Sequence, residues 1–393
     1  MRRIAANYIY TVEGAILKNG IVEVNNNGKV LKITDTKGEL KESSKLEFYN
    51  GVITPGFINT HCHLELSELK DIFNQGKGLP KFIREIFNYK SKEVSEKTYK
   101  AIELQNKLMR TAGIVVVADV SNTNNSINVK IRSEIYYHTF CEIAGTKSSP
   151  NKGFNSAQKL LTNFKDQGLS ASIVPHAPYS VSEELFKKIY ENAEKEDSIL
   201  SIHNQETESE NQMFINKTGV LFDTLEKLGV DLSNHKPTGN NSLKSIQNFL
   251  PRNNNIIFVH NTYSKYDDVR IAAEYFTNPY WCLCPLSNLY IENRLPDLNI
   301  FKNCSEKVTL GTDSLASNKT LSILDEMKAL AKHSDISFSE LLRWATINGS
   351  KALKLDNKFG SIKEGKTPGL NLISDFDFQN MCLTDKSKVK VLI

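Results

Sequence analysis

Two histidines flank a cysteine in the stretch "INTHCHLELS", residues 58–67. Histidine nitrogen and cysteine sulfur are both common zinc ligands, so the stretch predicts a metal site and leaves open whether the cysteine takes part. In a strand, residues two apart face the same side and the residue between them faces the other. His61 and His63 can therefore bind one ion together only if Cys62 points away from it. We expect Cys62 to be a small buried side chain and not a ligand.

Other histidines end further apolar segments of the chain. His176 ends the fourth strand-like segment, His203 the fifth and His260 the sixth, and Asp313 ends the eighth. The chain has only eight histidines, so scattering by chance would rarely bring five of them to such positions. Imidazoles combined with a carboxylate suit Zn²⁺, with Fe²⁺ or Mn²⁺ as alternatives. An ion held in this way lowers the pKa of a bound water to about 7 and makes hydroxide available at neutral pH.

Glu206 is the candidate for moving protons at such a site. It lies three residues after His203, where the fifth strand gives way to a loop, and it could reach the metal-bound water. The alternative is a solvated loop acid, because Glu208 and Glu210 follow closely. The spacing from His203 favours the catalytic interpretation.

The remaining candidates each have a structural alternative. His260 would polarise the electrophile or orient the hydroxide, but a histidine there could also satisfy a buried backbone group. Asp313 would bind the metal and accept a proton from its water, but it could also cap the following helix. His176, in "PHAPYSVS", is expected to contact the substrate and not the metal, with a role in a capped turn as the alternative.

Alternating strands and helices must position these residues. The β-rich segments are 51–63, 113–121, 134–144, 170–180, 198–206, 255–263, 279–287 and 307–314, and helical patterns cover 93–111, 182–196, 265–276 and 321–333. Apolar strands alternating with helices predict a parallel sheet covered on both faces. Eight units over about 300 residues indicate a (β/α)8 TIM barrel, which collects its chemistry at the C-terminal ends of its strands. A doubly wound open sheet is the alternative, but no Gly-rich phosphate turn follows any strand.

The two ends of the chain have a different texture. Short β-rich runs and a hairpin signal at 25–28 fill the first residues, and the last forty residues return to this pattern. Both ends therefore predict strands of one small antiparallel sheet. We expect a small β-sandwich domain from residues 1–53 and 356–393 and a metal-dependent barrel from residues 54–355.

Composition narrows the partners. Hydrophobic residues make up 40% of the chain, charged residues 24%, and the net charge is only +4, which gives no reason to expect a nucleic-acid or membrane partner. The six cysteines are scattered and read as free thiols of a reducing compartment. The N-terminus lacks a signal pattern, and no apolar run approaches the length of a membrane span. We expect a cytoplasmic protein with a small-molecule substrate, and a homodimer as the commonest default.

Six motifs in order resemble the amidohydrolase superfamily: "TPGFINTHCHLELS", "PHAPYSV", "SIHNQET", "FVHNTY", "CPLSN" and "LGTDSLASN". The resemblance covers nearly the whole chain and implies a barrel with a β domain split between the two termini. It implies the ligand set His61, His63, His203 and Asp313. Some members hold two metals bridged by a carboxylated lysine after the fourth strand, where this chain has "SIVPHAPYS" and no lysine. A single divalent ion is therefore implied, with zinc first and iron or manganese as alternatives.

Glu206 and His260 match the residues that mark the branch deaminating aromatic amino-heterocycles. Substrates in that branch include S-adenosylhomocysteine, methylthioadenosine, aminofutalosine and guanine. The resemblance implies attack of metal-bound hydroxide on the ring carbon that bears the amine. Glu206 would protonate the ring nitrogen and then help ammonia leave, while His260 and Asp313 would stabilise the developing charges.

Substrate choice is less determined by the sequence. "LGTDSLASNKTLSILDEMKAL" is most similar to adenosine-derivative and aminofutalosine members, which implies deamination of an amino-purine or adenosine-like compound. The third strand and its loop, "YYHTFCEIAGTKSSPNKG", offer no arginine for a substrate carboxylate, which argues against S-adenosylhomocysteine. Lys147 or Lys152 could substitute, although such loop lysines are ordinarily solvated. Phe82, Tyr179 and Asn318 are candidate substrate contacts.

Two other classes of function compete with deamination. The first is hydrolysis of a cyclic amide or a C–Cl bond by the same hydroxide. Deamination is favoured over it because a leaving amine must be protonated, which explains the presence of Glu206 and His260. The second is a catalytically silent barrel that binds metabolites or partners. Such a protein is expected to lose a ligand or the acid, and the chain keeps all of them.

Overall fold

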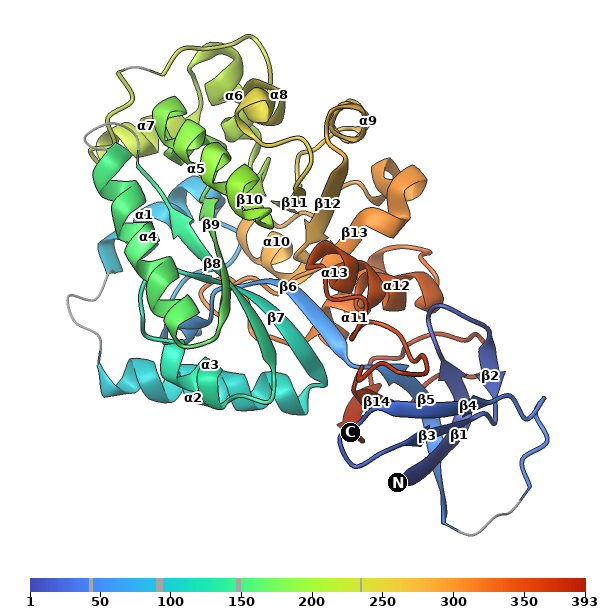
Figure 1. Cartoon of the computed structure of the whole chain (residues 1–393). Coiled ribbons are helices and arrows are strands. Elements are labelled where there is room, and N and C mark those ends of the chain that lie inside the picture. Colours follow the sequence, from blue (N-terminus) through green and yellow to red (C-terminus); the bar gives the residue numbers. More distant parts are fainter. Residues whose placement is uncertain (42–44, 90–94, 146–149, 234) are drawn as a thin grey trace.

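The computed structural model describes residues 1–41, 45–89, 95–145, 150–233 and 235–393. Two four-stranded parallel sheets occupy the body of the molecule, and a separate sheet holds both termini (Figure 1). The strands of the body are β6 (Phe57–Cys62), β7 (Ile114–Ser121), β8 (Tyr136–Ile143), β9 (Ser170–Pro175), β10 (Leu200–Asn204), β11 (Asn255–His260), β12 (Asn278–Leu283) and β13 (Val308–Leu310).

The edges of the two parallel sheets approach one another at both sides. On one side the backbone N–H of His203 in β10 donates to the carbonyl oxygen of His176, just after β9, at 3.0 Å. On the other side Cys62 of β6 forms a parallel bridge with Asp313, and the N–H of Thr312 donates to the carbonyl of His61 at 2.9 Å. Eight parallel strands that follow one another in chain order and meet at both edges are consistent with a barrel. The C-terminal ends of all eight strands then face one rim.

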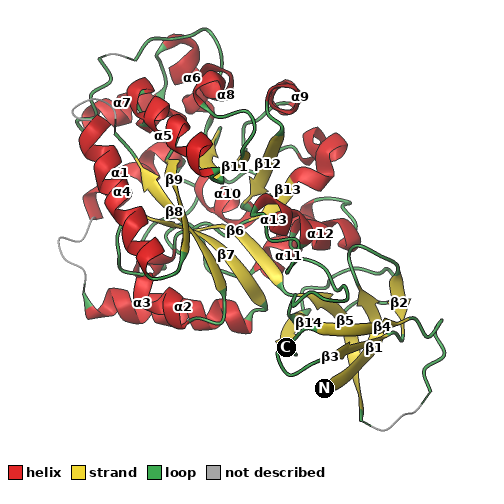
Figure 2. Ribbon diagram, viewed as in Figure 1, coloured by secondary structure: helices red, strands yellow, loops and turns green. Residues whose placement is uncertain are grey.

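Helices surround these sheets (Figure 2). They are α1 (Leu79–Tyr89), α2 (Glu96–Thr111), α3 (Ile127–Arg132), α4 (Pro150–Asp166), α5 (Glu183–Glu196), α6 (Glu208–Asn216), α7 (Val220–Lys227), α8 (Ser242–Ile246), α9 (Tyr266–Tyr275), α10 (Pro285–Glu292), α11 (Ile323–His333), α12 (Phe338–Trp344) and α13 (Ile347–Ala352). Short 3₁₀ turns are η1 (Leu64–Leu69), η2 (Pro178–Ser180), η3 (Gln247–Phe249) and η4 (Leu298–Lys307). The four predicted helices are confirmed as α2, α5, α9 and α11, and no helix among the described residues is long and apolar enough to cross a membrane.

Burial explains why these strands read as continuous apolar runs. Every residue of β7, "IVVVADVS", is buried, as are all residues of β6, β10 and β11. Strands covered on both faces lose the alternation of polar and apolar residues. The predicted segments overlap the observed strands, and all except 113–121, which ends with β7 at Ser121, extend beyond the C-terminal end of the strand. The segment 170–180, for example, ends as a strand at Pro175, because η2 begins at Pro178.

The terminal sheet contains strands from both ends of the chain. Its strands are β1 (Arg2–Tyr10), β2 (Ile16–Lys18), β3 (Ile21–Val24), β4 (Val30–Thr34), β5 (Leu46–Pro55), β14 (Leu370–Ser374) and β15 (Lys388–Val391). They pair in the order β15-β14-β5-β1-β3-β4, with β2 also on β1, so both chain ends share one sheet as predicted. The prediction of a purely antiparallel sheet is wrong, because β1 and β5 pair in parallel. After β1 the chain forms β3 and β4 on one side of β1, and β5 then lies on its other side.

Candidate metal centre and active site

Four polar side chains converge at the rim formed by the strand ends. Nε2 of His63 lies 3.1 Å from Nε2 of His61 and 3.3 Å from Nε2 of His203. Oδ1 of Asp313 lies 3.6 Å from Nε2 of His61 and 3.5 Å from that of His63. These residues come from β6, β10 and the loop after β13. Cys62 does not join them, because its fully buried side chain packs in the main hydrophobic core.

The nitrogen atoms of this cluster fit a cation. Nδ1 of His203 lies 2.7 Å from the carbonyl oxygen of His176, which can only accept, so His203 carries its proton on Nδ1 and presents a lone pair at Nε2. Nε2 of His63 can donate to at most one of its two nitrogen neighbours. At least one of the two close nitrogen pairs is therefore left without a hydrogen bond, and its nitrogen atoms repel each other. A divalent ion between the imidazoles would remove that repulsion. His61, His63 and Asp313 also place one donor atom each within 4.8 Å of the others.

Two serines orient the carboxylate of Asp313. Oγ of Ser287 donates to Oδ2 at 2.7 Å, and Oγ of Ser317 donates to the same oxygen at 2.5 Å. Oδ1 is thereby left toward the histidines. Burial acts to raise the pKa of Asp313, but the close approach of His61 and the electrostatic effect of His63 and His260 hold it well below its ordinary value. Asp313 is thus an anionic donor with a fixed orientation.

Glu206 and His260 form a buried pair beside these residues. Nε2 of His260 lies 3.7 Å from Oε1 of Glu206. Burial, reinforced by the charge of Asp313, raises the pKa of Glu206 well above its ordinary value. Burial lowers the pKa of His260 to about 4, so its ring is neutral at neutral pH. The pair therefore combines a carboxyl group whose pKa is raised with a neutral imidazole.

Asn288 fixes which nitrogen of His260 carries the proton. Its amide nitrogen donates to the carbonyl of His260 at 3.2 Å and to Oγ1 of Thr262 at 2.8 Å. Its amide oxygen, 3.2 Å from Nδ1 of His260, must then be the acceptor. His260 consequently keeps a lone pair on Nε2, the atom that faces Glu206.

The backbone is strained where these side chains leave their strands. Gln205, His260, Asn261 and Asp313 have φ values of 47°, 72°, 57° and 56°, in the left-handed region that non-glycine residues seldom occupy. The carboxylate of Glu210 supports one such turn by accepting the N–H groups of Gln205 at 3.0 Å and Glu206 at 3.2 Å. Such strain clusters at functional sites and persists only where surrounding contacts impose it.

A buried ion pair holds the chain next to His63. Oδ1 of Asp119, in β7, accepts the N–H of Leu64 at 2.7 Å. Its other oxygen lies 2.6 Å from Nζ of Lys130, and both side chains are completely buried. Lys130 also donates to Ser121 and Thr139. The pair thereby ties α3 and β7 to the residue that directly follows the second histidine.

Replacement of Lys130 by methionine is expected to lower the free energy of unfolding by about 3–5 kcal/mol, because it leaves the carboxylate of Asp119 buried without its cation. Urea denaturation followed by circular dichroism measures the loss. Lys354→Met is the matched control, since Lys354 and Asp197 pair at the same 2.6 Å but on the surface. That exposed pair is expected to contribute less than about 1 kcal/mol. Equal losses in the two variants would contradict the expectation.

The predicted substrate contacts lie in different surroundings. The ring of His176 lies 4.9 Å from that of His203 and 5.9 Å from that of Tyr179, so these two candidates gather beside the metal cluster. Phe82, in α1, packs in a small apolar cluster with Ala316 of the loop that carries Asp313.

The side chain of Asn318 forms hydrogen bonds within its own loop and to α11. Its amide nitrogen donates to the carbonyl of Thr312 and to Glu326, both at 2.8 Å, and its oxygen accepts the N–H of Lys319 at 2.7 Å. Lys152 is exposed in the first turn of α4, and Lys147 lies outside the described residues. The substrate roles of all these residues stay predictions.

Sequence reasoning missed the residues that orient the site. Ser287 and Asn288 stand in "CPLSN", and Ser317 follows Asp313 by four residues in "LGTDSLASN". Both motifs were recognised as wholes, but nothing in them says which hydroxyl or amide meets which distant partner. Glu142, at the end of β8, was also missed, and Oε1 of its carboxylate lies 3.6 Å from Nδ1 of His203.

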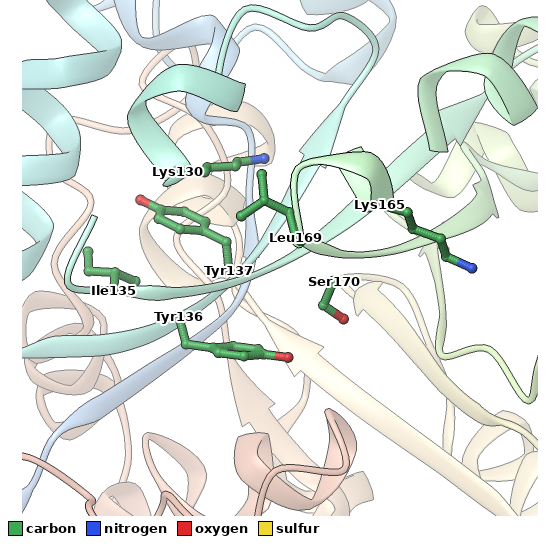
Figure 3. A pocket seen from close by; sticks show the side chains of 8 residues that line it. Lys130, Ile135, Tyr136, Tyr137, Lys165, Leu169 and Ser170 are labelled. Carbon is green, nitrogen blue, oxygen red and sulfur yellow. The ribbon is translucent and has the colours of Figure 1, made fainter. Parts of the chain in front are cut away.

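A cavity of about 400 Å³ opens at the opposite end of the sheet, where β8 and β9 begin (Figure 3). Tyr136, Tyr137 and Ser170 line it together with Lys130 and Lys165. Both lysines pair elsewhere: Lys130 with Asp119, and Lys165 with Glu196 at 3.3 Å. We therefore place the candidate active site at the histidine rim and not in this cavity.

Comparison with known proteins agrees with this geometry. A model of the amidohydrolase family matches residues 52–392. An adenosine deaminase of Helicobacter pylori is 28% identical over 366 residues, which cover 91% of this chain and 86% of that protein. The crystal structure of Helicobacter pylori aminofutalosine deaminase in complex with methylthio-coformycin has a TM-score of 0.83 at 24% identity, covering 96% of this chain and 93% of that one.

An adenosine deaminase from Xanthomonas campestris, whose crystal structure contains zinc, has a TM-score of 0.77 at 21% identity, covering 96% of this chain and 85% of that one. The two structural likenesses show that the chain shares the fold of these proteins.

Proposed function

Because the chain belongs to the amidohydrolase family, we propose that it is a metal-dependent aminohydrolase that releases ammonia from an amino-purine or adenosine-like compound. The observation that carries this proposal is the buried pair of Glu206 and His260 beside the converging ligands. A leaving amine must be protonated, and a buried carboxyl group whose pKa lies well above its ordinary value is suited to supply that proton. Methylthioadenosine and aminofutalosine are examples of the substrate class.

His61, His63, His203 and Asp313 would hold one divalent ion. Nitrogen donors with one carboxylate suit zinc, which is bound in the related Xanthomonas structure, and iron or manganese are the alternatives. When bound, the ion supplies a Lewis acid that makes a water molecule nucleophilic at neutral pH. The bond from His203 Nδ1 to the carbonyl of His176 fixes the ring and its tautomer, as the outer partners of metal-binding histidines do.

The side chains then divide the proton transfers between them. Oε1 of Glu206 delivers its proton to a ring nitrogen of the substrate, which makes the adjacent carbon electrophilic. His260 accepts a hydrogen bond at Nε2 and orients the attacking water. Asp313, held by Ser287 and Ser317, accepts the proton of that water at Oδ1. A C–O bond forms. Glu206, now a carboxylate, takes the proton of the new hydroxyl group and passes it to the amine, so that the C–N bond breaks, ammonia leaves and the carbonyl group of the product forms. The proton held by Asp313 then restores Glu206 to its acid form.

We further propose the arrangement of the whole chain around this site. The two parallel sheets would close into one (β/α)8 TIM barrel over residues 54–355. Residues 1–53 and 356–393 would form a small β-sandwich domain, supported by an apolar cluster of the terminal sheet that includes Ile4, Val22 and Leu372. The substrate is a small molecule, and a homodimer is the proposed assembly.

The proposal predicts ammonia release from adenine nucleosides by the zinc-loaded protein. Adenosine, 5′-deoxyadenosine, methylthioadenosine and aminofutalosine form the panel, and at least one is expected to reach a kcat/KM of about 10⁴ M⁻¹s⁻¹ or more. A coupled ammonia assay measures it. Chloride release from a chlorotriazine or ring opening of a cyclic amide is measured in parallel. Turnover of those compounds without ammonia from any nucleoside would contradict the proposal.

A further inference from the structure

Glu142 places a carboxylate at the rim, beside the histidines. It is the last residue but one of β8, on the face of the strand that also carries His138 and Phe140. Its oxygen and the ring nitrogens of His176 and His203 lie within 4.8 Å of one another. The side chain is only 8% exposed, so most of it is shielded from bulk water although it still lies at the site.

One oxygen of this carboxylate, Oε1, accepts no hydrogen bond from a described residue. Asn122 donates to Oε2 at 3.3 Å. Oε1 lies 3.6 Å from Nδ1 of His203, but that proton is already donated to the carbonyl of His176 at 2.7 Å. No lysine or arginine among the described residues pairs with Glu142. Oε1 of Glu142 therefore receives no hydrogen bond from a described residue and can accept one from a ligand.

His176 offers a second acceptor next to it. Oγ of Ser180 lies 3.2 Å from the carbonyl oxygen of Ala177, which can only accept, and 2.7 Å from Nδ1 of His176. We assign the hydroxyl proton to the carbonyl and the imidazole proton to Nδ1. Nε2 of His176 is then a lone-pair acceptor, and no described residue donates to it. Two neighbouring acceptors without a cation suit a ligand rich in hydroxyl groups and disfavour a carboxylate or phosphate.

We propose that Glu142 and His176 form a subsite that accepts the sugar hydroxyl groups of a nucleoside substrate, with Glu142 as a specificity-determining residue. The inference rests on the proposed function. It adds that the site also recognises the sugar of the substrate, away from the reacting ring. It also gives a structural reason why the end of the third barrel strand carries no arginine. The substrate is then a nucleoside with a free hydroxyl at this point.

The test combines removal of single hydroxyl groups from the substrate with removal of the Glu142 carboxylate from the protein. Ammonia release is measured for adenosine and for its 2′-deoxy, 3′-deoxy and 5′-deoxy analogues, with the zinc-loaded wild type and with Glu142→Leu. A hydrogen bond to a charged group corresponds to about 10- to 100-fold in kcat/KM, so the wild type should prefer adenosine over at least one analogue by that factor. In Glu142→Leu the preference should fall to about 3-fold or less, because adenosine loses rate and that analogue does not.

Two controls separate this effect from indirect ones. Glu134→Leu removes an exposed carboxylate just before the other end of the same strand and should keep the wild-type preference. The zinc content of Glu142→Leu should equal that of the wild type, which shows that His203 is undisturbed. Deamination with a preference that Glu142→Leu leaves unchanged would overturn the subsite alone. Absence of ammonia from every nucleoside, including those of the wider panel, would overturn the proposed function and the subsite with it.

Discussion

Replacing Glu206 by glutamine is expected to lower kcat by about 10²–10⁴-fold while the protein keeps its metal. Glutamine has the size of the carboxylic acid but cannot give up a proton to the ring nitrogen or to the leaving amine. The substitution disturbs few contacts, because the side chain of Glu206 forms no hydrogen bond with a described residue and its Oε1 lies 3.7 Å from Nε2 of His260. The loss should therefore appear in kcat, with KM changed far less.

The neighbouring acid provides the matched control. Glu208 follows Glu206 by two residues but is exposed, so Glu208→Gln should retain wild-type kcat and KM. Steady-state kinetics and metal analysis on both variants distinguish a proton donor from a solvated loop acid. Near wild-type turnover by Glu206→Gln would remove this residue from its role. Loss of metal in that variant would assign it to the ligand set instead.

Local patterns in the sequence predict the strands and the residues at their ends. The alternation in "HCH" places Cys62 in the core and both histidines on the other face, because a strand has a fixed period of two. Runs such as "GIVVVADVS" predict strands buried on both faces, because such strands lose the alternation of polar and apolar residues. That the residues at the strand ends meet at one rim can then be predicted without information on distant contacts, because the topology brings these ends together.

Contacts between distant polar groups follow no local pattern. Lys130 lies in a short helix where a lysine is ordinarily solvated, yet it is completely buried against Asp119. The amide of Asn318, a predicted substrate contact, donates to the carbonyl of Thr312 and to Glu326 of α11, which the sequence does not indicate. The spare acceptor of Glu142 depends on where the proton of His203 goes, which only the folded geometry decides. Residues that tune the site are therefore invisible until the strands are assembled.

His63→Ala is expected to lose the bound ion and to lower turnover by roughly 10⁴-fold or more, because water is a poor nucleophile at neutral pH without a Lewis acid. Nε2 of His63 contacts Nε2 of both other histidines and lies 3.5 Å from Asp313, so its removal opens the centre of the ligand set. Metal analysis by atomic emission, after purification without chelator, measures the first effect. The ammonia assay with added zinc measures the second.

Cys62→Ala is the sharpest comparison, because it changes the adjacent residue on the opposite face of the same strand. Its thiol packs in the hydrophobic core, where burial raises its pKa well above the ordinary value and keeps it protonated, whereas a metal ligand must be a thiolate. This variant should bind a full equivalent of metal and keep its kcat, with a loss of stability from the small cavity alone. Loss of metal from Cys62→Ala together with its retention in His63→Ala would reverse the assignment of the two faces, and with it the ligand set on which the proposed chemistry depends.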